Sequence, residues 1–224
     1  MNIRPLLLAV PLLATLVLTG CNDRGTSTPS PTPITSPAAS ATGGSSATAA
    51  PVATLPLGTG GAIPAIVTQV IAAVATGQAD AVTTLLAYQQ VGCTTAQGAG
   101  GPPKCKPGDA AGTVYRVFAT GTCEGEWVEN AQTRIADLVA ASGPMYAAVK
   151  VKAPSPDPEP YWPKGESLIY FRGKGGTPGT YFIMSADRIV RAHRICDLHD
   201  QPQADAFIQK LGGTEYLVPP SVPR

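Results

Sequence analysis

The chain has 224 residues with 14% charged side chains, and its formal net charge is +1 at neutral pH. A net charge so close to zero disfavours nucleic acid or another polyanion as a partner, because such partners are bound through an excess of Lys and Arg. Glycine and proline are frequent, with 24 and 23 copies. The remainder, residues 63–213, is long enough for one domain with a buried core.

The first 20 residues have the order of a secretory signal peptide. Arg4 supplies a positive charge, an apolar run covers residues 5–18, and two small residues precede Cys21. An uncleaved transmembrane helix is the less favoured alternative, because the run is short and contains Pro11. An ordinary cleaved signal that leaves a free Cys21 is a further alternative.

The tetrapeptide Leu18-Thr19-Gly20-Cys21 resembles the bacterial lipobox. In proteins that carry this motif, a diacylglyceryl group is attached to the cysteine thiol and the preceding peptide bond is then cut. The resemblance implies a lipid on Cys21 that anchors the protein to the outer face of a bacterial membrane. The domain would then be extracytoplasmic.

Residues 21–62 follow as a low-complexity segment. From Asn22 onward this segment consists almost wholly of Ser, Thr, Pro, Ala and Gly, and it contains no aromatic residue. Such a composition cannot offset its ordering entropy by burial, so it predicts a disordered tether between the lipid and the domain.

The domain opens with two predicted helices and a loop. Apolar residues recur at three- and four-residue spacing over residues 63–74, and Gly77 follows the last of them, which predicts a helix. Asp80 is a candidate cap for a second helix that closes near Gln89 or Gln90. The glycine- and proline-rich residues 91–112 predict a turn-rich loop.

The rest of the domain is dominated by predicted strands. Alternation predicts a strand over residues 113–120, and helical spacing returns over residues 127–139. The sequence then predicts four successive strands over residues 145–152, 167–172, 180–185 and 189–196. A short helix over residues 204–211 and a frayed tail over residues 214–224 follow. Strands that follow helices in this way indicate an α+β domain with a curved antiparallel sheet packed on helices.

Two segments resemble the nuclear-transport-factor-2-like, or SnoaL-like, cone fold. Residues 76–80 (Thr-Gly-Gln-Ala-Asp) join the two opening helices, and residues 187–193 (Asp-Arg-Ile-Val-Arg-Ala-His) lead into the closing strand. The resemblance implies that the helices and the curved sheet enclose a cavity. It also implies a possible activity, because dehydratases and isomerases occur in that family.

Four cysteines remain beside Cys21, and an even number in an exported chain predicts disulfides. Three connectivities are possible. We favour Cys93 with Cys105, which closes a local loop, and Cys123 with Cys196, which joins the ends of the first and last strands. A four-cysteine zinc site is disfavoured because the chain has no Cys-x-x-Cys pair, so we expect neither a metal nor a cofactor.

The densest polar cluster lies at the end of the last strand. It comprises His193, Cys196, Asp197, His199 and Asp200. The pattern of His193, Asp197 and His199 could ligate a metal, and a His-Asp pair could act as acid and base. The competing interpretation is a solvated strand end.

His193 shares its predicted strand face with Ile189, Arg191 and Ile195. If that face points into the cavity, His193 and Arg191 line a pocket, and Asp187 or Asp197 orients the imidazole. A second candidate contact is the aromatic pair Tyr161-Trp162, which is either an exposed tip for partners or buried against the sheet.

These features favour a non-enzymatic lipoprotein that binds a small molecule or an envelope protein. The alternative is a SnoaL-like dehydratase, isomerase or hydrolase with His193 as its base. A purely structural envelope protein would differ from the first hypothesis only in lacking a pocket.

Overall fold

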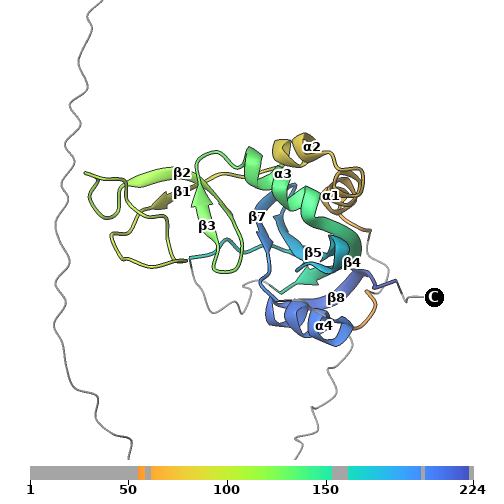
Figure 1. Cartoon of the computed structure of the whole chain (residues 1–224). Coiled ribbons are helices and arrows are strands. Elements are labelled where there is room, and N and C mark those ends of the chain that lie inside the picture. Colours follow the sequence, from red (N-terminus) through yellow and green to blue (C-terminus); the bar gives the residue numbers. More distant parts are fainter. Residues whose placement is uncertain (1–54, 59–61, 153–160, 198–199, 222–224) are drawn as a thin grey trace, which may run out of the picture. The chain divides into compact units, whose positions relative to one another are not determined.

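The computed structural model describes residues 55–58, 62–152, 161–197 and 200–221 (Figure 1). The predicted lipobox and most of the predicted tether lie outside these residues. The described helices are α1 (Ala65–Ala75), α2 (Ala79–Thr84), α3 (Gln132–Ala141), α4 (Gln201–Lys210) and the short 3-10 helix η1 (Lys174–Gly176). The strands are β1 (Gln89–Gly92), β2 (Val114–Thr120), β3 (Glu126–Val128), β4 (Ser142–Val151), β5 (Ser167–Gly173), β6 (Thr180–Ser185), β7 (Arg188–Arg194) and β8 (Gly213–Val218).

The strands form one curved, open sheet, so the α+β class expected from the sequence is confirmed. The strand order is β1-β2-β7-β6-β5-β4-β8, and β3 pairs with β2 beside this path. Every strand pair is antiparallel except β2 with β7, which run parallel. The expectation of a wholly antiparallel sheet is therefore wrong at this one contact. β7 returns to the sheet beside β2 after the intervening hairpins, and it arrives in the same direction.

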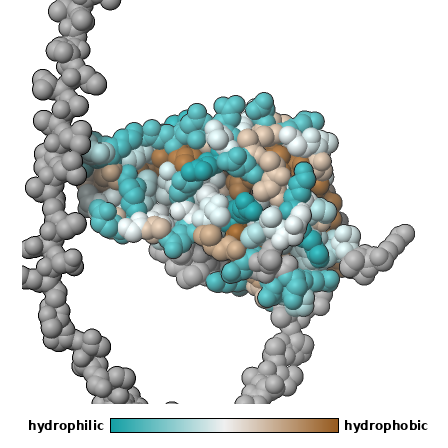
Figure 2. All heavy atoms as spheres, viewed as in Figure 1, coloured by the Kyte–Doolittle hydropathy of each residue, from teal (hydrophilic) through white to brown (hydrophobic). Residues whose placement is uncertain are grey.

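Helices cover both faces of the sheet (Figure 1). α1, α2 and α3 pack on one face in a core that includes Phe118, Phe182 and Ile189. α4 packs on the opposite face in a second core that includes Tyr170 and Tyr181. Figure 2 shows that the visible surface mixes hydrophilic and hydrophobic residues without one large hydrophobic area. We call the two sides of the sheet the α1–α3 face and the α4 face.

The opening helix pair is present, but α2 is shorter than predicted. α1 buries an apolar stripe and ends before Gly77, whose φ of 70° suits a chain reversal that glycine makes without strain. α2 ends at Thr84, because Leu86 bridges to Ile189 and the next residues join β1. Gln89 and Gln90 therefore pair with β2 instead of closing the last turn of a helix.

The predicted third helix begins five residues later than expected. Trp127 lies in β3, where it pairs with Ala119, and α3 starts only at Gln132. The helical spacing is present in the sequence, yet pairing with β2 satisfies the backbone of residues 126–128.

Both ends of the predicted domain extend further than expected. The segment predicted as a frayed tail contains β8, which pairs with β4 along one edge of the sheet. Pro56 and Gly58 then bond to β8, since the Tyr216 amide donates to the Pro56 carbonyl at 2.9 Å and the Gly58 amide donates to the Tyr216 carbonyl at 3.0 Å. The last part of the predicted tether is thus attached to the sheet edge.

Both favoured disulfides are present. Cys93 and Cys105 are joined within the loop between β1 and β2. Cys123, which follows β2, is joined to Cys196, which follows β7. The second disulfide therefore holds the ends of the two parallel strands together.

Candidate functional site

His193 lies on β7 and faces α4, so it does not point toward α1–α3. It pairs with Tyr181 on β6, and the two rings stack with their centroids 5.4 Å apart. Its Nε2 atom lies 2.9 Å from the Cys123 carbonyl oxygen. The residue is only 2% exposed.

Burial keeps this imidazole neutral. Loss of hydration, followed by the positive charge of Arg191, lowers the pKa of His193 to about 4, although the hydrogen bond to Cys123 acts in the opposite direction. In the neutral ring Nε2–H donates to the Cys123 carbonyl, so Nδ1 carries the free lone pair. Nδ1 has no hydrogen-bond partner among the described residues.

Arg191 is also buried, between two aromatic rings. Its guanidinium carbon lies 4.6 Å from the centre of the Trp162 ring and 5.5 Å from that of Tyr181. Such contacts compensate part of the cost of burying a cation. Trp162 is 1% exposed and stacks on Trp127. The proposal of an exposed aromatic tip is therefore wrong for Trp162, and Tyr161 beside it is partly buried.

The bulge in β7 explains why the face assigned from the sequence is only partly right. The register between β6 and β7 shifts between the pairs Ile183 with Arg191 and Met184 with Ile189. This extra residue changes the phase of the strand, so Ile189 and Ala192 both pack on the α1–α3 face. His193 then lies on the α4 face.

The predicted carboxylates do not contact His193. Asp187 is exposed and lies before β7, about 20 Å along the strand from His193 at 3.3 Å per residue. It forms an ion pair of 3.9 Å with Arg188. Asp197 is exposed beyond the other end of β7. No hydrogen bond in the described part of the chain joins either carboxylate to the imidazole.

The remainder of the predicted polar cluster has other roles or lies outside the described residues. Asp200 caps α4 by accepting a hydrogen bond from the Gln203 amide at 2.9 Å, in a reciprocal capping box. Cys196 is in a disulfide, and His199 is not described. Within the described ranges, no three His, Cys, Asp or Glu side chains are placed to hold a metal. No helix there has the length and apolar character needed to cross a membrane.

A pocket that was not predicted lies between α3 and the ends of β2 and β7. We call it the α3 pocket; its volume is about 480 Å³. Small or apolar side chains of α3 form one wall, and charged side chains of α3, β3 and β7 surround it. The lining residues are Thr120, Gly121, Thr122, Glu126, Arg134, Asp137, Leu138, Ala140, Ala141 and Arg194.

The strand register explains why these side chains meet. Thr120 pairs with Glu126, and both alternate with residues of the α4 face, so they point toward α3. Arg194 follows Ala192 by two residues and therefore shares its face. His193 and Arg194 are neighbours in sequence, yet they lie on opposite faces of the sheet.

The polar groups of the α3 pocket are unevenly satisfied. Arg134 and Glu126 form an ion pair of 2.7 Å. By contrast, neither Arg194 nor Asp137 has an ion pair within the described part of the chain. Thr120 is fully buried, and its hydroxyl oxygen lacks a hydrogen-bond partner among the same residues. A buried hydroxyl without a partner costs about 1–3 kcal/mol, so a ligand atom that bonds to it would recover this energy.

A second concave region lies on the loop and strands that extend away from the helices in Figure 1. We call it the arm groove; its volume is about 650 Å³ and its lining includes residues 98–104, Tyr115, Val117 and Trp127. The Trp127 indole N–H donates to the Gly101 carbonyl at 3.0 Å, which attaches the loop to β3.

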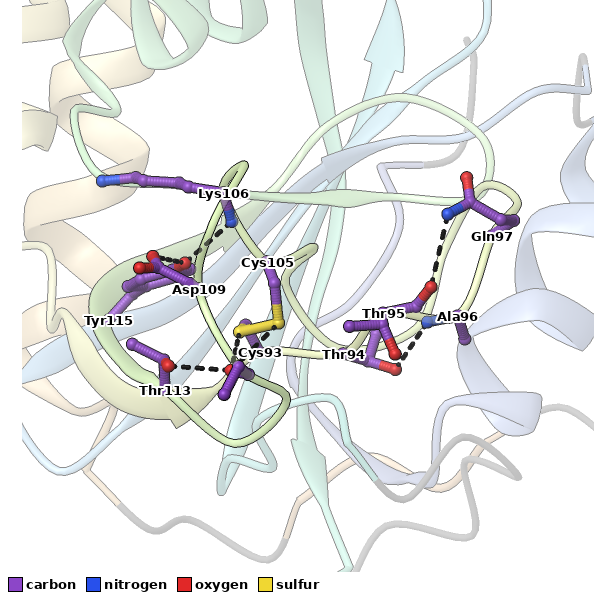
Figure 3. The surroundings of a disulfide bond; sticks show 11 residues. Cys93, Thr94, Thr95, Ala96, Gln97, Cys105, Lys106, Asp109, Thr113 and Tyr115 are labelled. Atoms are coloured by element: carbon purple, nitrogen blue, oxygen red, sulfur yellow. Dashed lines mark hydrogen bonds between the residues drawn. A yellow bond between two sulfur atoms is a disulfide. The ribbon is translucent and has the colours of Figure 1, made fainter.

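The Cys93–Cys105 disulfide supports the base of this loop (Figure 3). Beside it the Tyr115 hydroxyl accepts a hydrogen bond from the Lys106 amide at 2.8 Å and donates one to Asp109 at 2.5 Å. These contacts order a segment whose glycine and proline content predicted only turns.

The β2–β7 end of the sheet therefore carries two concave regions, the α3 pocket and the arm groove. His193 and Arg191 line neither region, and the Trp162 ring contacts both of them. Comparisons with family models, with curated proteins and with solved structures find no match for this chain.

Proposed function

We propose that this protein is a lipoprotein, anchored through Cys21 to the outer face of a bacterial membrane, whose domain binds a small ligand in the α3 pocket. We also propose that the domain is a nuclear-transport-factor-2-like cone. The helix pair that opens the domain, the curved open sheet and the helices on its α1–α3 face support that assignment.

The α3 pocket is the observation that carries the ligand-binding proposal. Its volume of about 480 Å³ lies in the range of small-molecule sites. It combines apolar side chains with Arg194, which has no ion pair among the described residues, and with Thr120, whose buried hydroxyl has no hydrogen-bond partner there. Charged and hydroxyl groups that face a small apolar wall can orient a bound ligand.

The enzyme alternative depends on His193, and the surroundings of His193 argue against it. A general base must come within hydrogen-bond reach of the proton that it removes. Here the imidazole is covered by Trp162 and Tyr181, and it lines neither the α3 pocket nor the arm groove. We therefore do not assign a catalytic role to this residue.

A ligand screen tests the proposal. The full chain carrying Cys21→Ser would be incubated with a library of small acids, amines, zwitterions and neutral polar molecules, and its thermal unfolding would be followed. We expect at least one class to raise the unfolding temperature, and Arg194→Gln to remove that increase. Arg188→Gln changes an exposed arginine at the other end of β7 and is the matched control. If no compound binds, or if Arg194→Gln has no more effect than Arg188→Gln, the proposed site is wrong.

Anchoring is tested separately in a bacterial host. Labelling with radioactive palmitate should mark the wild-type chain and not Cys21→Ser, and only the wild-type chain should remain with membranes after a high-salt wash. Equal labelling of both chains would exclude lipidation at Cys21.

A second candidate function, binding of an envelope protein, is favoured by the arm groove. The Cys93–Cys105 disulfide and the bond from Trp127 to Gly101 order the loop that lines this groove. A half-buried tryptophan such as Trp127 is common in protein contacts. A photo-crosslinking residue at position 104 should capture one defined envelope protein in living cells. The same residue at exposed position 174 is the control, and equal capture from both positions would contradict this candidate.

A further inference from the structure

The charges around the α3 pocket restrict the kind of ligand that it can hold. The guanidinium of Arg134 and the carboxylate of Glu126 neutralise each other at 2.7 Å. Two formal charges remain, one positive on Arg194 and one negative on Asp137. They line the same pocket, yet no ion pair joins them, so their charged atoms are farther apart than 4.0 Å.

The two remaining charges come from different elements. Arg194 ends β7 and shares the α1–α3 face with Thr120, the buried residue whose hydroxyl has no partner among the described residues. Asp137 belongs to α3, near the end where Ala140 and Ala141 also line the pocket. The C-terminal end of a helix carries a partial negative charge, which adds to that of Asp137. One side of the pocket therefore favours an anion and the other a cation.

We propose that the α3 pocket binds a small zwitterion, such as a free α-amino acid or a betaine. The ligand carboxylate pairs with Arg194 and accepts a hydrogen bond from the Thr120 hydroxyl. The ligand ammonium lies beside Asp137 and the C-terminal turns of α3, and the apolar part of the ligand contacts Leu138 and the two alanines. This inference rests on the proposed ligand-binding function and specifies its ligand class.

Ligands with only one charge fit this distribution less well. A simple carboxylate would pair with Arg194 but would lie in the same pocket as the unpaired Asp137. A simple amine would have the opposite mismatch. A zwitterion of zero net charge matches both groups, and it also agrees with the zero net charge of the four charged side chains that line the pocket.

Three related compounds test the requirement for both charges. L-Valine carries both groups, 3-methylbutanoate lacks only the ammonium, and isobutylamine lacks only the carboxylate. A panel of the common L-amino acids and glycine betaine would first be screened by thermal unfolding of the full chain with Cys21→Ser. The best amino acid and its two single-charge analogues, built as for valine, would then be titrated by calorimetry. We expect each analogue to bind about 10- to 100-fold more weakly than the zwitterion, as for the loss of one charged hydrogen bond.

Variants identify the groups that make these contacts. Arg194→Gln should weaken the zwitterion about 10- to 100-fold. Asp137→Asn should weaken the zwitterion but not the carboxylate analogue. Thr120→Val should weaken binding several-fold while leaving the unfolding temperature of the free protein unchanged or raised, because it removes a buried hydroxyl without a partner. Arg188→Gln and Asp187→Asn are exposed controls and should bind as the wild type does.

The possible outcomes separate this inference from the proposal on which it rests. If a neutral, purely anionic or purely cationic compound of the wider library binds through Arg194 and no zwitterion does, the ligand class is wrong but the pocket is a ligand site. Equal affinity for the zwitterion and its carboxylate analogue also overturns the zwitterion assignment. Failure of every compound overturns both.

Discussion

His193 and Arg194 are adjacent on one strand, and the sheet places them in opposite environments. The imidazole is buried on the α4 face, under Trp162 and against Tyr181, and its pKa is lowered to about 4. The guanidinium lies on the α1–α3 face at the edge of a pocket, and it has no ion pair among the described residues. The more reactive residue type is thus the less accessible one. Chemical identity alone did not distinguish the structural residue from the candidate ligand contact.

The covering side chains on the two faces produce this difference. On the α4 face large rings fill the space, and the Trp127, Trp162 and Tyr181 rings form a continuous aromatic layer with Arg191. On the α1–α3 face the last turn of α3 presents alanines toward the ends of the strands, so space remains. A substitution on one face of the sheet should therefore leave the other face largely unaffected.

The largest expected effect on stability is on the α4 face. Trp162→Ala removes a fully buried ring, and we expect a loss of about 4 kcal/mol in the free energy of unfolding. Because water would then reach the imidazole, the pKa of His193 should rise toward its ordinary value near 6.5. Chemical denaturation measures the first change and an NMR titration the second. Tyr161→Ala, at a partly buried neighbour, should have a clearly smaller effect. Equal effects of the two variants would contradict the burial of Trp162.

Acid should lower the stability of the protein through His193 on the α4 face. The pKa of this residue is about 4 in the folded protein and about 6.5 in the unfolded chain, so between these values the unfolded chain binds more protons. Stability is therefore lost as the pH falls from about 6.5 to 4, by roughly 3 kcal/mol in total. Denaturant unfolding at several pH values checks this, with His193→Gln as the comparison. The variant should lose less stability over this interval, and an identical pH dependence would show that another group titrates.

The parts of the fold that were predictable have strong internal patterns. The α1 stripe and the short, turn-bounded apolar runs of β5 and β6 give each element its type before any contact with the rest of the chain. β3 and β8 were missed because they form only through pairing with β2 and β4. Trp127 shows the conflict directly: its spacing fits a helix, yet its backbone pairs with Ala119.

The candidate site was less predictable than the fold. The sequence directed attention to β7, but of the neighbours His193 and Arg194 it is Arg194 that lines the α3 pocket. The phase of β7 depends on a bulge next to Val190, and the bulge is visible only in the register with β6. Trp162 could not be placed because a proline-rich segment has no periodicity that separates burial from exposure.

Two glycine substitutions separate the cost of backbone strain from the cost of disturbed packing on the α4 face. Gly125 has a φ of 77°. A Cβ atom at this position would lie 2.6 Å from the Trp162 ring and 2.9 Å from the His193 ring. Gly175 has a similar φ of 65°, but nothing lies within 4 Å of its Cβ position. We expect Gly175→Ala to cost about 1 kcal/mol from strain alone, and Gly125→Ala to cost about 2 kcal/mol more. Denaturation midpoints check both. Similar losses in the two variants would mean that the aromatic layer can yield to a methyl group.

The smallest effect on stability is expected on the α1–α3 face, where a substitution tests the ligand site directly. Arg194→Gln removes a half-exposed charge without an ion pair among the described residues, so the free energy of unfolding should change by less than about 0.5 kcal/mol. Ligand binding should nevertheless be lost, because the proposal assigns the ligand carboxylate to this guanidinium. Trp162→Ala should have the opposite pattern, with a large loss of stability and retained binding in the molecules that stay folded. Denaturation and calorimetry on both variants measure all four values. A large loss of stability in Arg194→Gln would instead place this arginine among the structural contacts of the sheet, as Arg191 is on the α4 face.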